Sequence, residues 1–204
     1  MTILLYGHPY SHNSRKVQWA LEELGLDYEL RVVDLMTGQQ KQSEFLRLNP
    51  NGRVPVIHDG ELVLYESNAI LWYLANKAGA LLPKDAAGRA LTMQWLAWQV
   101  SDLGPACVEP WLAKFYASLG QPFDAAKHRE QVERAKHPLS VLDAHLNGRR
   151  AVVGQELGVA DIAIAESIGL CGFAGIDLAP YAAIRAWYEP LTQRAAFAKT
   201  RPQG

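Results

Sequence analysis

The pattern of hydrophobic and polar residues changes along this chain from mixed strand and helix signals to helical signals alone. Residues 2–7 and 28–34 are rich in β-forming side chains, and apolar residues recur at helical spacing over residues 13–24. Gly25 stops that helical run. The beginning of the chain is therefore predicted to form a strand, a helix and a second strand.

A hairpin and a further helix follow. Residues 54–58 and 62–65 are apolar runs on either side of Asp59-Gly60, a dipeptide typical of tight β-hairpins. A short helical segment precedes the hairpin, and residues 67–78 have a helical pattern. Residues 1–78 are thus predicted to form an α/β domain with the order β-α-β-α-β-β-α and a mixed sheet.

The second half of the chain has almost no strand signals. Pro83, which cannot continue a helix, lies in the segment 79–85, which we interpret as a linker. Residues 86–204 are predicted to form an all-helical second domain. Its predicted helices cover residues 89–101, 108–119, 125–146, 160–169 and 181–194.

Composition and charge narrow the classes of function. With 204 residues, of which 49% are hydrophobic and 20% charged, the chain is typical of a globular protein that buries its own core. A net charge of −1 gives no basic field for phosphates, so we expect no nucleic-acid partner. No stretch has the length of a transmembrane helix, and Gly7 and Pro9 interrupt the apolar start. We therefore expect neither a membrane partner nor a signal peptide.

Cysteine and histidine positions point to a cytoplasmic protein without a bound metal. Cys107 and Cys171 are far apart in the sequence and form no C-x-x-C motif, which fits a reducing compartment. His8 and His12 are four residues apart, but Pro9 keeps them from sharing a helical face as metal ligands.

Two short motifs predict a binding site for a small extended peptide. An Asn51-Gly52 turn leads into a strand that Pro55 interrupts at once, and an X-Pro bond is where a cis peptide occurs. A cis Val54-Pro55 bond leaves the Val54 amide and carbonyl unpaired, so an extended ligand can pair with them main chain to main chain. Glu66-Ser67 precedes an apolar helical run, and amides at a helix N-terminus bind carboxylates.

These features together resemble the cytosolic glutathione transferase family over essentially the whole chain. The resemblance rests on a thioredoxin-like first half, the joint spacing of Arg53-Val54-Pro55 and Glu66-Ser67, and an all-helical second half. The run from Tyr10 to Val17 is similar to that of the serine-type members, which include the phi, theta and nu-like bacterial groups. The resemblance implies glutathione as cosubstrate and a homodimer.

The resemblance places Ser11 at the position of the catalytic hydroxyl. The glutathione thiol has a pKa of about 8.5, so only a few per cent is thiolate at pH 7. A hydroxyl at the start of a helix can donate to the sulfur while the helix N-terminus supplies positive potential. Asn13 is a second candidate, because nu-like members hold the sulfur with an asparagine, and Tyr6 is a weaker one. The alternative for Ser11 is a turn or capping residue, although Ser14 is favoured as the N-cap.

The resemblance also assigns the rest of the peptide. It places Glu66 and Ser67 on the γ-glutamyl end, where Glu66 can take the ammonium and Ser67 the α-carboxylate. Val54, with Pro55, is placed on the cysteinyl main chain. The alternative for Glu66-Ser67 is a capping pair that binds no ligand.

The glycine carboxylate of the peptide needs donors, and Gln40, Lys41 and Arg53 are available. Phi-type members usually have a histidine where Gln40 stands. The alternative for Lys41 and Arg53 is a solvated surface cation. His12, next to Ser11, is a further predicted glutathione contact.

The family places the electrophile between its domains. Tyr10 and His12 from the first domain are predicted to wall a hydrophobic pocket together with Trp111, Phe115 and Tyr116 from the second.

We therefore expect an enzyme, a glutathione S-transferase that activates the glutathione thiol for attack on an electrophilic small molecule, as in detoxification. One alternative is a glutathione-dependent disulfide-bond reductase, as in nu-like relatives. It would use no protein thiol, because no cysteine stands near Ser11 in the sequence. A second alternative is a non-catalytic adaptor on the same fold, like the stringent starvation proteins. An adaptor does not need Ser11, Val54-Pro55 and Glu66-Ser67.

Overall fold

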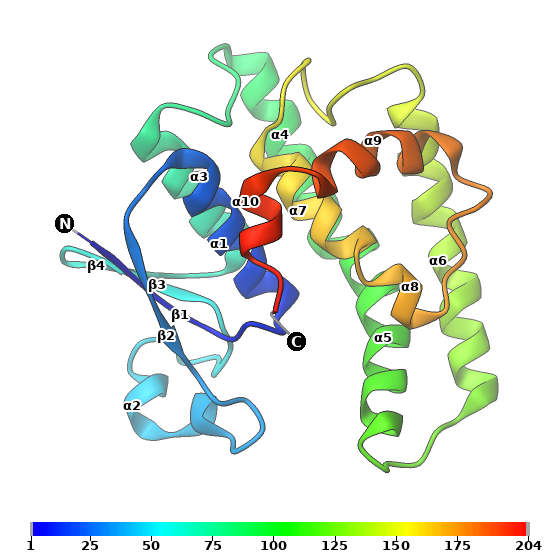
Figure 1. Cartoon of the computed structure of the whole chain (residues 1–204), viewed down its shortest axis with the longest axis horizontal. Helices are drawn as coiled ribbons and strands as arrows, with labels where there is room; N and C mark the ends of the chain where they lie inside the picture. The colour runs from blue at the N-terminus through cyan, green and yellow to red at the C-terminus, as the bar shows by residue number, and fades with distance from the viewer. Residues whose placement is uncertain (1, 203–204) are drawn as a thin grey trace. The chain divides into compact units, whose positions relative to one another are not determined.

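The computed structural model of the protein describes residues 2–202. They divide into two compact units: residues 2–82 with residues 194–202, and Pro83–Gln193 (Figure 1). The first unit is a thioredoxin-like α/β domain and the second is helical. Both features confirm the predicted fold class.

The sheet of the first unit has the order β2-β1-β3-β4, which makes it mixed as predicted. Strand β1 (Ile3–Gly7) pairs in parallel with β2 (Tyr28–Val32) and antiparallel with β3 (Val56–Asp59). Strand β4 (Leu62–Tyr65) completes the hairpin with β3. The parallel pair requires a crossover connection, which is why a helix separates β1 from β2.

Helices α1 (His12–Leu24) and α3 (Ser67–Ala78) pack against each other in the first unit. Gly25 ends α1 in the left-handed conformation, as its position in the sequence predicts. Short helices η1 (Gln39–Lys41) and α2 (Ser43–Leu46) follow β2. Phe45 of α2 packs with Val33 and Val56 in a buried cluster. Helix α2 therefore packs on part of the core beside the sheet. Helices α1 and α3 supply the two helix N-termini of the candidate site.

A last helix, α10 (Ala195–Lys199), corrects the predicted domain boundary. The sequence assigns residues 86–204 to one helical domain, but residues 194–202 belong to the first unit. The reason is packing against α1: Phe197 meets the fully buried Trp19 edge to face, with ring centroids 5.0 Å apart. Arg194 also holds Glu23 through both carboxylate oxygens, at 2.6 Å each.

The second unit contains the long helical segments that the sequence predicts, but one predicted break is absent. Helix α4 (Ala86–Trp98) runs through a π-helical turn, η2 (Gln99–Leu103), directly into α5 (Gly104–Ser118). The sequence instead predicts a break between residues 101 and 108. The other helices are α6 (Ala125–Leu146), α7 (Val159–Ile168), α8 (Cys171–Ala174) and α9 (Ala182–Thr192).

The interior of the second unit contains a hydrogen-bonded carboxylate and a pair of neighbouring thiols. Asp161 is buried in α7 and accepts hydrogen bonds from the Val152 amide at 2.8 Å, the Gly158 amide at 3.0 Å and the Trp187 indole at 2.8 Å. These contacts give Asp161 a structural role. Cys107 and Cys171 are free, buried thiols whose sulfur atoms lie 3.8 Å apart.

Candidate functional site

A small cavity of about 80 Å³ in the first unit brings most of the predicted binding residues together. It is lined by Asn13, Asn49, Arg53, Val54, Pro55, Glu66 and Ser67. These residues come from the start of α1, the turn before β3 and the start of α3. Ser11, His12, Gln40 and Lys41 are not among the residues that line it.

The turn before β3 shapes one wall of this cavity. The Val54-Pro55 bond is cis, and β3 begins only at Val56, because Pro55 has no amide to donate to the ladder. Within residues 2–202, the amide and carbonyl of Val54 have no hydrogen-bond partner. Both groups remain able to pair with an extended ligand.

Asn49 is a lining residue that we do not identify from the sequence. Its side chain is buried, donates to the Arg53 carbonyl at 2.7 Å and accepts from the Asn51 amide at 3.0 Å. These bonds fix the turn that carries Arg53 and Val54. The signal was present in the Asn-Pro-Asn-Gly run, because an asparagine that bonds to the backbone two residues later is typical of tight turns.

Glu66 and Ser67, at the start of α3, form another part of the cavity lining. Glu66 has φ 70° and ψ 110°, a conformation that costs a non-glycine residue about 1–3 kcal/mol. Its side chain does not cap α3, and the first helical bond runs from the Ile70 amide to the Glu66 carbonyl. The Ser67 amide therefore has no partner within the helix, as expected for an anion-binding N-terminus.

The start of α1 corrects the predicted cap. The helix begins at His12 with Ser11 as its N-cap, and the Ser11 hydroxyl accepts from the Ser14 amide at 3.3 Å. Ser14 is not the N-cap, because its own hydroxyl is buried and accepts from the His8 amide at 3.1 Å. Ser11 uses a lone pair in the cap, so its hydroxyl proton remains available to a ligand.

Asn13 connects the two helix starts. Its Oδ1 atom lies 3.2 Å from the Ser67 hydroxyl, which donates to it from 54 positions away in the sequence. Both residues line the cavity. Of the two candidates for contact with a thiol, Asn13 is therefore in the cavity wall and Ser11 is not.

His12 is an uncharged residue at neutral pH. Burial, with the nearby charges of Lys16 and Arg15, lowers the pKa of His12 to about 3. Its imidazole can therefore contribute a polar contact but no positive charge near pH 7.

Gln40 and Lys41 lie in η1, away from the cavity lining. The Lys41 ammonium donates to the Asn51 carbonyl at 3.3 Å from an exposed position. The Gln40 amide donates to the Leu35 carbonyl at 3.5 Å. Arg53 is thus the predicted carboxylate donor that the structure brings to the cavity.

The five residues predicted to wall an electrophile pocket are divided between the units. Tyr10, which is 60% exposed, and His12 belong to the first unit. In the second unit, Trp111 and Phe115 stack with centroids 5.0 Å apart, and Tyr116 tilts against Phe115 at 5.7 Å. A pocket shared by these residues stays a prediction.

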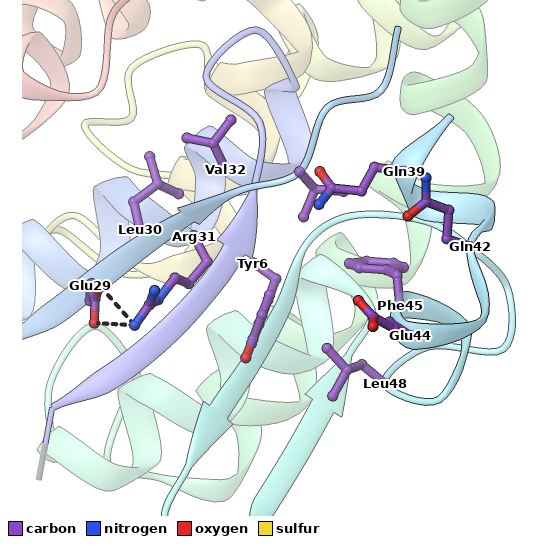
Figure 2. Close-up of a pocket in the computed structure, with 11 residues that line it drawn as sticks. Tyr6, Glu29, Leu30, Arg31, Val32, Gln39, Gln42, Glu44, Phe45 and Leu48 are labelled. Carbon is purple, nitrogen blue, oxygen red and sulfur yellow. Dashed lines mark hydrogen bonds and ion pairs between the residues drawn. The ribbon is translucent and has the colours of Figure 1, made fainter. Parts of the chain in front are cut away.

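A larger cavity of about 480 Å³ lies elsewhere in the first unit, between β1, β2 and α2 (Figure 2). The Tyr6 ring lies among the side chains that line it, with Arg31 of β2 and Phe45 of α2 (Figure 2). Tyr6 also packs against the buried cluster around Val33. These contacts account for Tyr6 as a packing residue.

Residues 2–202 contain neither a cluster of potential metal ligands nor a helix that could cross a membrane. Nowhere in this range do three or more histidine, cysteine or acidic side chains gather as potential metal ligands. None of the helices in the same range is long and apolar enough to cross a membrane.

The fold and the site define a class: a two-unit protein in which a thioredoxin-like unit has a small cavity at two helix N-termini. The sequence matches the model of the glutathione S-transferase N-terminal domain over residues 1–76 and that of the C-terminal domain over residues 99–195. The chain belongs to the glutathione S-transferase family.

Individual relatives agree with this assignment. The disulfide-bond oxidoreductase YfcG of Escherichia coli (strain K12) is 38% identical over 191 residues, which cover 90% of this chain and 87% of YfcG. One solved structure is a glutathione transferase family member from Pseudomonas fluorescens pf-5 with two glutathione bound. It superimposes on this chain with a TM-score of 0.90 at 34% identity, and the alignment covers 98% of this chain and 92% of that one. A glutathione transferase from Pseudomonas putida, solved with one glutathione disulfide bound per subunit, has a TM-score of 0.88 at 33% identity, with 98% and 90% coverage.

Proposed function

We propose that the protein binds glutathione in the cavity of the first unit and uses its thiolate to attack an electrophilic small molecule. The observation that carries the proposal is the meeting of Asn13, Val54, Glu66 and Ser67 around one cavity of about 80 Å³. The cavity is too small for a whole tripeptide, so glutathione would place its cysteinyl and γ-glutamyl parts there and extend outward. Glutathione transferases from two Pseudomonas species that resemble this chain were solved with glutathione or its disulfide bound.

Each part of glutathione has a complementary group in this cavity. The unpaired main chain of Val54 pairs with the cysteinyl backbone. The Glu66 carboxylate takes the ammonium, and the Ser67 amide at the start of α3 takes the α-carboxylate. Arg53 is available to the glycine carboxylate.

Thiol activation in this proposal comes from the start of α1. The helix N-terminus supplies positive potential, and the Ser11 hydroxyl has a proton to donate while its lone pair caps the helix. The Asn13 amide provides a second donor from the cavity wall. His12 is neutral at pH 7 and adds no positive charge.

Reduction of a disulfide is the second candidate reaction. The glutathione thiolate would attack one sulfur of a disulfide, form a mixed disulfide and release the other sulfur as a thiolate. A second glutathione thiolate would then attack the glutathione sulfur of the mixed disulfide, which forms glutathione disulfide and releases the second thiolate. The relative YfcG, which carries the name disulfide-bond oxidoreductase, favours this reaction, as does the Pseudomonas putida structure with bound glutathione disulfide. Both candidates use the same activated thiol.

The test compares binding and both reactions in one preparation. We expect retention on immobilised glutathione, conjugation of an aryl halide, and loss of both in Glu66→Gln but not in Glu61→Gln, a matched exposed glutamate outside the cavity lining. Reduction of 2-hydroxyethyl disulfide much faster than conjugation of any halide would select the second candidate. If the protein shows no binding and no turnover at millimolar glutathione, both candidate reactions are overturned and the non-catalytic adaptor is left.

We further propose a cytoplasmic homodimer whose second substrate is a hydrophobic electrophile. Family membership supports the dimer, and the stacked Trp111 and Phe115 supply apolar surface of the kind such a substrate needs. Sedimentation at several concentrations tests the dimer: a mass that stays at the 22.6 kDa of one chain would refute it.

A further inference from the structure

The hydrogen bond between Ser67 and Asn13 gives the two ends of the Asn13 amide different roles. Asn13 lies in the first turn of α1, and Ser67 is the first residue of α3. Their side chains meet at 3.2 Å, with the Ser67 hydroxyl facing Oδ1. Because the oxygen and nitrogen of an amide point in different directions, fixing Oδ1 on Ser67 turns Nδ2 elsewhere.

The orientation of this amide matters to an anionic ligand atom in the same cavity. A thiolate accepts hydrogen bonds and donates none, so an Nδ2 group that faces it stabilises the charge, and an Oδ1 atom that faces it repels the charge. Which end of an amide points where is decided by its hydrogen-bond network. Ser67 is the residue of that network that comes from outside α1.

We propose that Ser67 is a positioning residue for Asn13: its hydroxyl holds Oδ1, so that Nδ2 presents its donors to the glutathione sulfur. The inference rests on the proposed glutathione site and adds a role that the binding of the γ-glutamyl end does not require. The Ser67 hydroxyl proton is committed to Asn13. The lone pairs of that hydroxyl remain able to accept from the ligand ammonium, and the α-carboxylate is left to the main-chain amide at the start of α3.

The test separates positioning from simple binding. Ser67→Ala frees the Asn13 amide, Ser67→Thr keeps the hydroxyl, and Asn13→Asp keeps an oxygen for Ser67 but replaces the Nδ2 donor with a second oxygen. The pKa of the bound glutathione thiol is measured from the ultraviolet absorbance of the thiolate against pH. Affinity for S-methylglutathione, which cannot form a thiolate, is measured in parallel.

For Ser67→Ala we expect the pKa of the bound thiol to rise by about one, which lowers the thiolate fraction at pH 7 by up to about 10-fold. Affinity for S-methylglutathione should fall at most about 5-fold, since the main-chain contacts remain. Ser67→Thr should keep the wild-type thiol pKa, and Asn13→Asp should raise it at least as much as Ser67→Ala does. An unchanged thiol pKa in Ser67→Ala or in Asn13→Asp would overturn the inference and leave Ser67 as a binding residue alone.

A ligand-free measurement keeps this inference distinct from the proposed function. The NMR resonances of the Asn13 side-chain amide should move in Ser67→Ala and return in Ser67→Thr. If they do so but wild-type protein binds neither glutathione nor S-methylglutathione, the proposed function fails while the Ser67–Asn13 contact stands. If the resonances are the same in Ser67→Ala and wild type, the positioning contact itself is refuted.

Discussion

Removing the Arg194 side chain should destabilise the protein in a pH-dependent way. Glu23 accepts three hydrogen bonds: two from Arg194 at 2.6 Å and one from the Trp19 indole at 2.9 Å. The Glu23 side chain is only 9% exposed beside Arg194, so Arg194→Ala removes two of its three hydrogen bonds and opens the carboxylate to water. Hydrogen bonds to charged groups contribute about 1.5–3 kcal/mol. Because the Arg194 side chain is 42% exposed and partly screened by water, we expect a loss of about 1–2 kcal/mol.

The pH dependence follows from the pKa of Glu23. Burial by itself raises this pKa, but the hydrogen bonds from Arg194 and Trp19 outweigh burial and lower it below its usual 4.5. A carboxyl whose pKa is lower in the folded state stabilises the fold above its unfolded pKa and loses that contribution as the pH falls through the folded value. The difference between wild type and Arg194→Ala should therefore be full at pH 7 and shrink below about pH 4.

Urea unfolding followed by tryptophan fluorescence measures this difference at several pH values, and thermal unfolding should show a fall in Tm of about 3–6 °C. Two controls set the scale. Lys199→Ala removes a more exposed pair with Glu22, and Lys136→Ala removes a pair with Glu133 in which both side chains are more than 60% exposed. We expect less than about 1 kcal/mol for the first and almost nothing for the second. Equal losses in Arg194→Ala and Lys136→Ala, or a loss that stays the same from pH 7 to about pH 3, would refute the reasoning.

Three further predictions concern single residues. Ser11→Ala should reduce the rate of conjugation about 10- to 100-fold at pH 7 and clearly less near pH 9, because the thiol ionises unaided at high pH. Equal losses at both pH values would instead mean that Ser11 orients the ligand. The lost N-cap should also cost about 1 kcal/mol in denaturant unfolding. Because the pKa of His12 is about 3, its imidazole NMR signals should not titrate between pH 4.5 and 8, and a midpoint near 6.5 would contradict its burial. Asp161→Ala should destabilise the fold by about 3–5 kcal/mol, because it leaves two buried donors and one partly buried donor without their acceptor, and a loss under about 1 kcal/mol would exclude that role.

Much of the fold could be predicted because its elements are long enough to show a period. The helix over residues 67–78 has its predicted limits, and the Asp59-Gly60 hairpin is confirmed. Helices α8 and α10 could not be predicted, because four and five residues are too few to show a helical repeat. The position of α10 depends on a ring contact between Phe197 and Trp19 that no local pattern encodes.

The candidate site could be predicted in part, for a different reason. Val54-Pro55 and Glu66-Ser67 have special local chemistry, so the sequence predicts the cis bond and the helix start that the structure has. The choice of cap for α1 was wrong because Ser11 and Ser14 are both good capping residues. Only the bond from the His8 amide to the Ser14 hydroxyl decides between them, and it depends on how the chain turns after β1.

The contact between α10 and α1 has a consequence for biosynthesis. The first unit needs residues 194–202, which the ribosome makes only after the whole helical unit. Until then Trp19 lacks its partner Phe197, and the Glu23 carboxylate lacks Arg194. The emerging thioredoxin-like half therefore carries an apolar surface on α1 until residues 194–202 have been made. A fragment that stops at the boundary between the units should keep that surface uncovered and depend on chaperones.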